Sequence, residues 1–133
     1  MKRTQTILLV EDEPISRRFM STMLKDNGYF VLEASSGKAA QELHARHRGP
    51  IHILVTDIIL SGPMDGIELG VEMRRTRTEL RAVYLSDYPS DTAEKLGVET
   101  DAEYFLSKPF TPKMFLGMME ECMSHPVLRT KAA

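Results

Sequence analysis

Three acidic residues, a serine and a lysine each follow a short apolar run in this chain: Glu11, Asp12, Asp57, Ser86 and Lys108. Carboxylates that share one site repel one another, and a divalent cation relieves that repulsion. Oxygen ligands without histidine or cysteine favour Mg²⁺ or Mn²⁺. Lys108 could supply a point charge to a phosphoryl group, and Ser86 a hydroxyl donor. The pattern predicts a metal-assisted site at which Asp57 is the nucleophile.

The elements that must position these side chains alternate between two patterns. Continuous apolar runs occupy residues 7–10, 29–32, 51–55, 82–85 and 104–106. Helical spacing follows each run, over residues 14–23, 36–47, 65–71, 93–97 and 111–122. Continuous apolar runs are typical of strands buried on both faces of a parallel sheet. We therefore expect an α/β fold of five β–α units, with a doubly wound parallel sheet whose strand ends bring the polar residues together.

Local signals indicate where the helices begin. Pro14 suits a first helical turn, because its missing N–H would have no partner there. Asp65 and Thr111 are expected to be N-caps. Ile15 and Phe19, four residues apart, mark the apolar spacing of the first helix.

Composition excludes several classes of protein. The 133 residues are 42% hydrophobic and 27% charged, which favours one folded domain, expected over residues 1–124 with a flexible tail at 125–133. A net charge of -2 without a basic block argues against nucleic-acid binding. No apolar stretch approaches the ~20 residues of a membrane span, and Cys122 has no disulfide partner in the chain. We expect a cytoplasmic protein.

The polar residues and their surroundings resemble a known family, the CheY-like receiver domain of two-component response regulators, over about residues 5–123. The resemblance rests on five segments in the same order and at matching separations: Ile7–Pro14, Val55–Asp57, Met64–Gly66, Tyr84–Ser86 and Leu106–Phe110. It implies the flavodoxin-like strand order 2-1-3-4-5.

The resemblance also implies a role for each site residue. Asp57 would accept a phosphoryl group from a histidine kinase or a histidine phosphotransfer protein. Glu11 and Asp12 would hold Mg²⁺ together with Asp57 and the backbone carbonyl of Ile59. Lys108 would contact a phosphoryl oxygen. Such a domain catalyses its own phosphorylation in a phosphorelay.

In the family, phosphorylation shifts an equilibrium between inactive and active states. Ser86 would move toward the phosphoryl group, and Phe105 would follow as the aromatic switch residue. The fourth helix, fifth strand and fifth helix would present the output face to a downstream protein. A monomer or a weak homodimer is expected.

Three departures from the family pattern bear on function. Asp87 replaces a small residue and could repel phosphate, and Phe105 lacks the hydroxyl of the frequent tyrosine. The loop after Asp57 is one residue longer than usual. Together with Ser86-Asp87-Tyr88, that loop resembles receivers of hybrid sensor kinases. Neither Ile59 nor Tyr88 is suited to orient water, so slow autodephosphorylation is expected.

Alternative interpretations stay open at this point. Asp87 favours an interaction module that keeps the fold without phosphorylation. The chain could also be the receiver fragment of a hybrid histidine kinase. A phosphatase with an aspartate nucleophile fits less well, because Asp-x-Asp would follow the first strand, whereas Ile59 stands two residues after Asp57.

Overall fold

The protein folds around one parallel sheet of five strands in the order β2-β1-β3-β4-β5, as predicted. The computed structural model describes residues 4–87 and 103–124. The strands are β1 (Thr6–Val10), β2 (Phe30–Ala34), β3 (Ile53–Asp57), β4 (Arg81–Ser86) and β5 (Glu103–Ser107).

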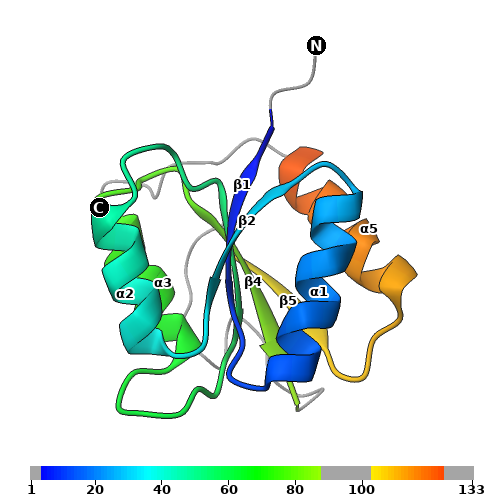
Figure 1. Ribbon diagram of the computed structural model, residues 1–133, viewed down its shortest axis with the longest axis horizontal. Helices are drawn as coiled ribbons and strands as arrows, with labels where there is room; N and C mark the ends of the chain where they lie inside the picture. The colour runs from blue at the N-terminus through cyan, green and yellow to red at the C-terminus, as the bar shows by residue number, and fades with distance from the viewer. Residues whose placement is uncertain (1–3, 88–102, 125–133) are drawn as a thin grey trace.

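Helices cover both faces of this sheet. They are α1 (Pro14–Asp26), α2 (Gly37–Arg46), α3 (Gly66–Arg74) and α5 (Pro112–Ser124). α1 and α5 lie on one face, and α2 and α3 on the other (Figure 1). The helix predicted at 93–97 and the tail predicted at 125–133 lie outside the described residues. Within the described part of the chain, every helix is too short or too polar to cross a bilayer.

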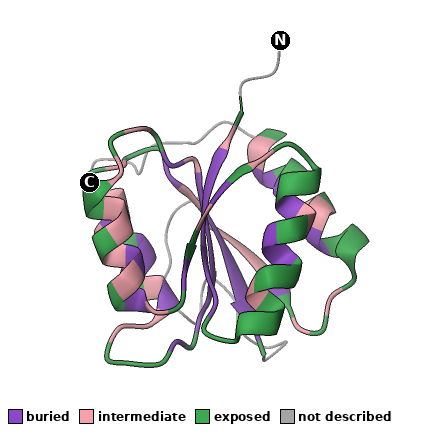
Figure 2. Ribbon diagram, in the orientation of Figure 1, coloured by how far each residue is buried: buried purple, intermediate pink, exposed green. Residues whose placement is uncertain are grey.

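The core has two layers, one on each side of the sheet (Figure 2). Every residue of β1 and β3 is buried, which explains their continuous apolar sequences. On β1, Ile7 and Leu9 face the layer that includes Phe115 of α5, and Leu8 packs in the layer that includes Leu69 of α3. The edge strand β2 leaves Phe30 half-exposed.

The buried face of α1 differs from the one that its first apolar residues mark. Ile15 is 79% exposed and Phe19 is 55% exposed, whereas Met20 and Leu24 are buried. Successive helical residues point about 100° apart, so the pair Met20–Leu24 repeats the four-residue spacing on another face of the helix. The helix is confirmed, but two large apolar side chains remain at its surface.

The helix-start signals are confirmed. Pro14 is the first residue of α1, and α5 also begins at a proline, Pro112, directly after the cap Thr111. The side chain of Asp65 accepts a hydrogen bond from the backbone N–H of Glu68, whose own side chain accepts from the N–H of Asp65. The hydroxyl of Thr111 accepts a bond of 3.1 Å from the N–H of Met114. Both caps satisfy helix donors that would otherwise be unpaired.

Candidate functional site

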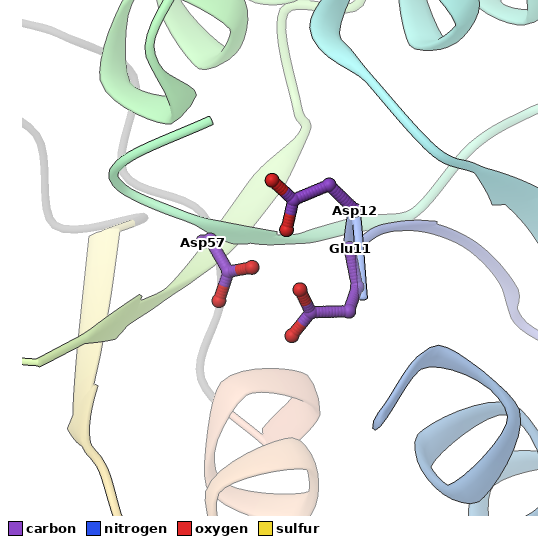
Figure 3. Close-up of side chains that lie close together, drawn as sticks. All are labelled: Glu11, Asp12 and Asp57. Atoms are coloured by element: carbon purple, nitrogen blue, oxygen red, sulfur yellow. The ribbon is translucent and has the colours of Figure 1, made fainter. Parts of the chain in front are cut away.

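The sheet register brings three carboxylates together at the carboxyl ends of β1 and β3. Val10 pairs with Thr56, so the residues that follow, Glu11 and Asp57, stand side by side. Each of Glu11, Asp12 and Asp57 offers an oxygen within 4.8 Å of the others (Figure 3). Glu11 and Asp57 are only 2% and 5% exposed, whereas Asp12 is open to solvent. The site is therefore a mostly buried acidic cluster with one open side.

A glycine at the start of α3 holds the loop behind Asp57 in place. A side chain at Gly66 would collide with the backbone carbonyl of Asp57. The N–H of Gly66 also donates a 2.7 Å hydrogen bond to the carbonyl of Ile58. Because only glycine permits this close approach, α3 can begin directly against the end of β3.

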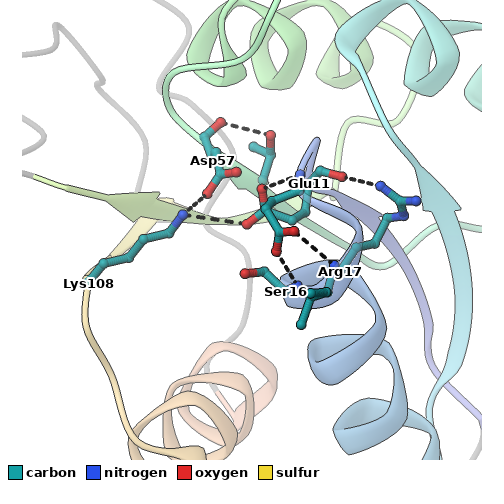
Figure 4. Close-up of polar contacts among 8 residues, drawn as sticks. Glu11, Ser16, Arg17, Asp57 and Lys108 are labelled. Atoms are coloured by element: carbon teal, nitrogen blue, oxygen red, sulfur yellow. Dashed lines mark hydrogen bonds and ion pairs between the residues drawn. The ribbon is translucent and has the colours of Figure 1, made fainter.

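Lys108 directly follows β5, the strand at the edge of the sheet, and its side chain extends to the cluster. Its Nζ lies 2.6 Å from Oδ1 of Asp57 and 3.5 Å from Oε1 of Glu11 (Figure 4). Its backbone N–H donates a 2.7 Å hydrogen bond to the carbonyl of Ser86 at the end of β4. The peptide bond from Lys108 to Pro109 is cis. The residues predicted from three separate strand ends thus form one constellation.

The electrostatics of the cluster reflect crowding of like charges. Burial raises the pKa of Glu11, and the neighbouring carboxylate of Asp57 raises it further, against the opposing effects of the Glu13 backbone N–H and of Lys108. Burial alone would lower the pKa of Lys108, but Asp57, Glu11 and Asp87 outweigh it and raise the pKa. The lysine is therefore held in its charged form by the acids around it.

The donor set fits a hard divalent cation. Three carboxylates converge, and neither histidine nor cysteine belongs to the cluster that the described residues form. Mg²⁺ is bound in proteins by one or two carboxylates and keeps other positions for water or phosphate oxygens. The exposed side of Asp12 leaves room for such ligands.

Glu13, which follows the acidic pair Glu11 and Asp12, is a helix cap and does not belong to the acidic cluster. Its carboxylate accepts hydrogen bonds of 3.2 Å and 2.7 Å from the N–H groups of Ile15 and Ser16, so it caps α1. These bonds lower the pKa of Glu13.

The remaining predicted residues lie around the cluster with different exposures. Ser86, the last residue of β4, is 2% exposed. Phe105 on β5 is half-buried, and its ring centroid is 5.4 Å from that of Tyr84. Ile59 is 62% exposed in the loop after β3, and Asp87 is exposed after β4. Tyr88 lies outside the described residues.

Sequence reasoning missed one residue that contacts the acidic segment. Nη1 of Arg17 donates a 2.7 Å hydrogen bond to the backbone carbonyl of Glu11. Arg17 precedes another arginine in a polar stretch, and no motif distinguishes the two. Only the turn between β1 and α1 determines which of them reaches the site.

Comparison with known proteins identifies the family. Residues 7–120 match the family described as response regulator receiver domain. The chain is 34% identical over 119 residues to the sensor kinase CckA of Brucella abortus, covering 89% of this chain and 12% of that protein. The chain therefore spans a small part of that kinase's length.

Solved structures agree with this assignment. A response regulator receiver protein from Sinorhizobium medicae is 28% identical, with a TM-score of 0.80 over 92% of this chain and 96% of that one. The receiver domain of the hybrid histidine kinase CckA is also 28% identical, with a TM-score of 0.74 over 89% of this chain and 98% of that one. The chain belongs to the response regulator receiver family, the phosphoacceptor domains of two-component signalling.

Proposed function

We propose that Asp57 accepts a phosphoryl group from a phosphohistidine in a Mg²⁺-dependent reaction. The observation that carries the proposal is the 2.6 Å contact of Lys108 Nζ with Asp57 Oδ1 inside a cluster of three carboxylates. The donor would be a histidine kinase or a histidine phosphotransfer protein. The similarity to CckA supports a kinase histidine as the donor, on a separate protein or on a hybrid kinase.

Glu11, Asp12 and Asp57 are the residues that would hold Mg²⁺, with the backbone carbonyl of Ile59 as a further oxygen ligand. When bound, the cation would neutralise part of the charge on the incoming phosphoryl oxygens. The mutual repulsion that raises the pKa of Glu11 supports this assignment, because a cation would relieve it.

The covalent step is a displacement at phosphorus. A carboxylate oxygen of Asp57 forms the new O–P bond while the P–N bond to the donor imidazole breaks. The bonding electron pair leaves with the imidazole nitrogen, and Asp57 becomes an acyl phosphate. Lys108, which holds Asp57 in the unphosphorylated chain, would turn its charge to the phosphoryl oxygens.

Activation would follow from new contacts of the phosphoryl group. Ser86 stands at the end of β4, next to the strand that carries Asp57. Its hydroxyl would donate to a phosphoryl oxygen, and Phe105 would then repack against Tyr84. These contacts differ between the two states, so they bias a pre-existing equilibrium. The downstream protein would read the change on the face formed by the expected fourth helix, β5 and α5, where Met114 of α5 is half-exposed.

The donor protein would dock on α1. Ile15 and Phe19 lie one turn apart on this helix, and both are largely exposed. Ile15 is in the first turn, directly after the acidic segment that carries Glu11 and Asp12. An apolar contact there would place a phosphohistidine close to Asp57.

The test is phosphorylation by a small phosphodonor with Mg²⁺, followed by intact mass measurement. The wild type should gain about 80 Da, one phosphoryl group. The gain should vanish in Asp57→Asn and without Mg²⁺, but persist in Asp26→Asn, which alters an exposed aspartate at the end of α1. A gain that survives Asp57→Asn would refute the assignment of the phosphoacceptor.

A second function, binding a partner without phosphorylation, is favoured by Asp87. Its exposed carboxylate acts on Lys108 closely enough to raise the pKa of that lysine, so it would also repel an incoming phosphate. If the wild type gains no mass from a small donor or a phosphohistidine protein, Asp87→Gly decides the matter. A mass gain in that variant alone identifies Asp87 as the block.

The phosphorylated state should be long-lived. Ile59 is 62% exposed two residues after Asp57 and offers no group that could orient an attacking water. Tyr88 is likewise expected to be poorly suited to orient an attacking water. The phosphoryl group on the purified protein should therefore last well beyond seconds, and decay within seconds would contradict this expectation.

A further inference from the structure

Arg17 contacts two strands of the sheet without being a ligand of the acidic cluster. Its Nη1 donates to the backbone carbonyl of Glu11 at 2.7 Å, and its Nε lies 3.8 Å from Oε1 of Glu33 on β2. Its side chain is 22% exposed. Figure 4 shows the guanidinium reaching back from α1 to the Glu11 carbonyl. One planar group therefore links the end of β1 to β2.

The carbonyl that Arg17 holds belongs to the peptide unit between the two acidic residues. This unit is planar and includes the Cα atoms of both Glu11 and Asp12. Fixing its oxygen therefore restrains the positions of both Cα atoms, from which the two carboxylates reach toward Asp57. β1 ends at Val10, so the carbonyl lies beyond the regular strand pairing, and its partner is the arginine.

Arg17 is itself held by Glu33. The hydroxyl of Ser21 donates a 3.0 Å hydrogen bond to Oε2 of Glu33, and Nζ of Lys25 lies 3.6 Å from the same oxygen. Glu33 pairs across the sheet with Leu9, two residues before Glu11. The carboxylate is thus fixed next to the acidic segment and orients the guanidinium. A lysine at position 17 would have one compact charge, and it could not both donate to the Glu11 carbonyl and keep the ion pair with Glu33 as the planar guanidinium does.

We propose that Arg17 is a positioning residue of the metal site. It holds the peptide between Glu11 and Asp12 in the orientation that aims both carboxylates at Asp57. Without it, the cation itself must order this turn, and binding weakens. Residues that orient metal ligands from behind typically contribute about 10–100-fold to metal affinity. The inference rests on the proposed Mg²⁺-dependent function.

Electrostatics alone would give the opposite result. Arg17 is a cation near a cation site, so removing its charge should strengthen Mg²⁺ binding if charge were its only influence. A role confined to tying α1 to β2 would lower thermal stability and leave the affinity of folded protein unchanged. The sign of the change in affinity therefore separates positioning from both other roles.

The experiment is a Mg²⁺ titration of the full chain, followed by the NMR shifts of the backbone amides in the acidic segment. The dissociation constant should rise about 10-fold or more in Arg17→Ala and in Arg17→Lys, which keeps the charge but loses the planar fork. Arg18→Ala, a neighbouring exposed arginine with the same loss of charge, should bind as the wild type does. Thermal melts without metal show whether each variant is folded at the titration temperature.

The outcomes separate the two proposals. Unchanged or tighter Mg²⁺ binding in folded Arg17→Lys, with saturable binding by the wild type, overturns the role of Arg17 alone. Failure of the wild type to bind Mg²⁺ at all overturns the metal-dependent function proposed above. If Arg17→Ala is unfolded, Arg17→Lys alone decides the outcome by the same criterion.

Discussion

Charged side chains are arranged differently at the two ends of the sheet. At the carboxyl ends of the strands, Glu11 and Asp57 are buried beside each other, and the pKa of Glu11 is raised. At the amino ends, before β3 and β4, the guanidinium of Arg77 is surrounded by acceptors. One end concentrates like charges, and the other pairs a charge with many partners.

The amino-end cluster consists of Arg77 and the end of α2. Nε of Arg77 donates to Nδ1 of His44 at 2.8 Å, and Nη1 donates to the carbonyl of Gly49 at 2.9 Å. Nη2 donates to the carbonyls of His44 and His47 at 3.1 Å and 3.0 Å. The last carbonyls of a helix lack partners within the helix, and Arg77 satisfies them.

The fold therefore places a stabilising polar network at one end of the sheet and the candidate functional site at the other. The amino end gains stability from a satisfied polar network. The N–H groups of Arg77 already donate to protein acceptors, so they are not available to a ligand. The carboxyl end keeps carboxylates whose repulsion an external cation can relieve, which costs stability in the metal-free chain.

The largest expected effect is at the amino end. Arg77→Ala removes four hydrogen bonds and leaves carbonyls at the end of α2 without a donor, so the free energy of unfolding should fall by about 3 kcal/mol. Urea unfolding measures the loss. Arg75→Ala removes an exposed arginine nearby and should change stability little. Equal losses in the two variants would show that the network contributes nothing of its own.

The next effect, at the carboxyl end, has the opposite sign. Glu11→Gln removes one buried like charge, so without metal the variant should be about 1 kcal/mol more stable than the wild type at neutral pH. It should also bind Mg²⁺ more weakly, which the NMR titration measures.

The pH dependence follows from the raised pKa of Glu11. Between its ordinary and its raised pKa, the native state holds more protons than the unfolded state. Stability contributed by this group therefore falls as pH rises through that window. Glu11→Gln should lack this fall, whereas Glu42→Gln, on the exposed side of α2, should retain it. If Glu11→Gln kept the wild-type pH profile, the carboxyl group of Glu11 would not be the source of the fall in stability.

The acidic cluster could be predicted from the sequence because the topology of the parallel sheet alone brings its residues together. Glu11, Asp57 and Lys108 each follow an apolar run, and parallel strands bring their carboxyl ends to one edge. The position of each residue along its own strand was sufficient. No knowledge of side-chain packing was needed.

The arginine contacts could not be predicted in that way. Arg17 and Arg77 reach backbone carbonyls on other elements, and any polar stretch can supply an arginine. Their partners depend on how the turns place each helix against the sheet. The outward face of α1 escaped prediction for a related reason, because the spacing of Ile15 and Phe19 is the same as that of the buried pair Met20 and Leu24.

The smallest expected effect is a loss of stability at the amino end in mild acid. Burial, together with the charge of Arg77, lowers the pKa of His44 against the opposing effect of Glu72. The native state therefore holds fewer protons than the unfolded state just below the ordinary pKa of 6.5, and stability falls as pH falls through that window. A protonated Nδ1 also cannot accept from Arg77. Because the ring is partly exposed, the loss should be only a few tenths of a kcal/mol.

Urea unfolding of the wild type and of His44→Gln at about pH 7.5 and about pH 5.5 isolates this effect, because glutamine does not titrate. The wild type should lose more stability than His44→Gln over this interval, since every other titrating group is common to both proteins. Mg²⁺ affinity per folded molecule should change equally in the two proteins, because the acidic cluster lies at the other end of the sheet. A loss of stability that is as large in His44→Gln would place the acid sensitivity outside the Arg77 network, and the amino end would then owe its stability to contacts that do not depend on a neutral histidine.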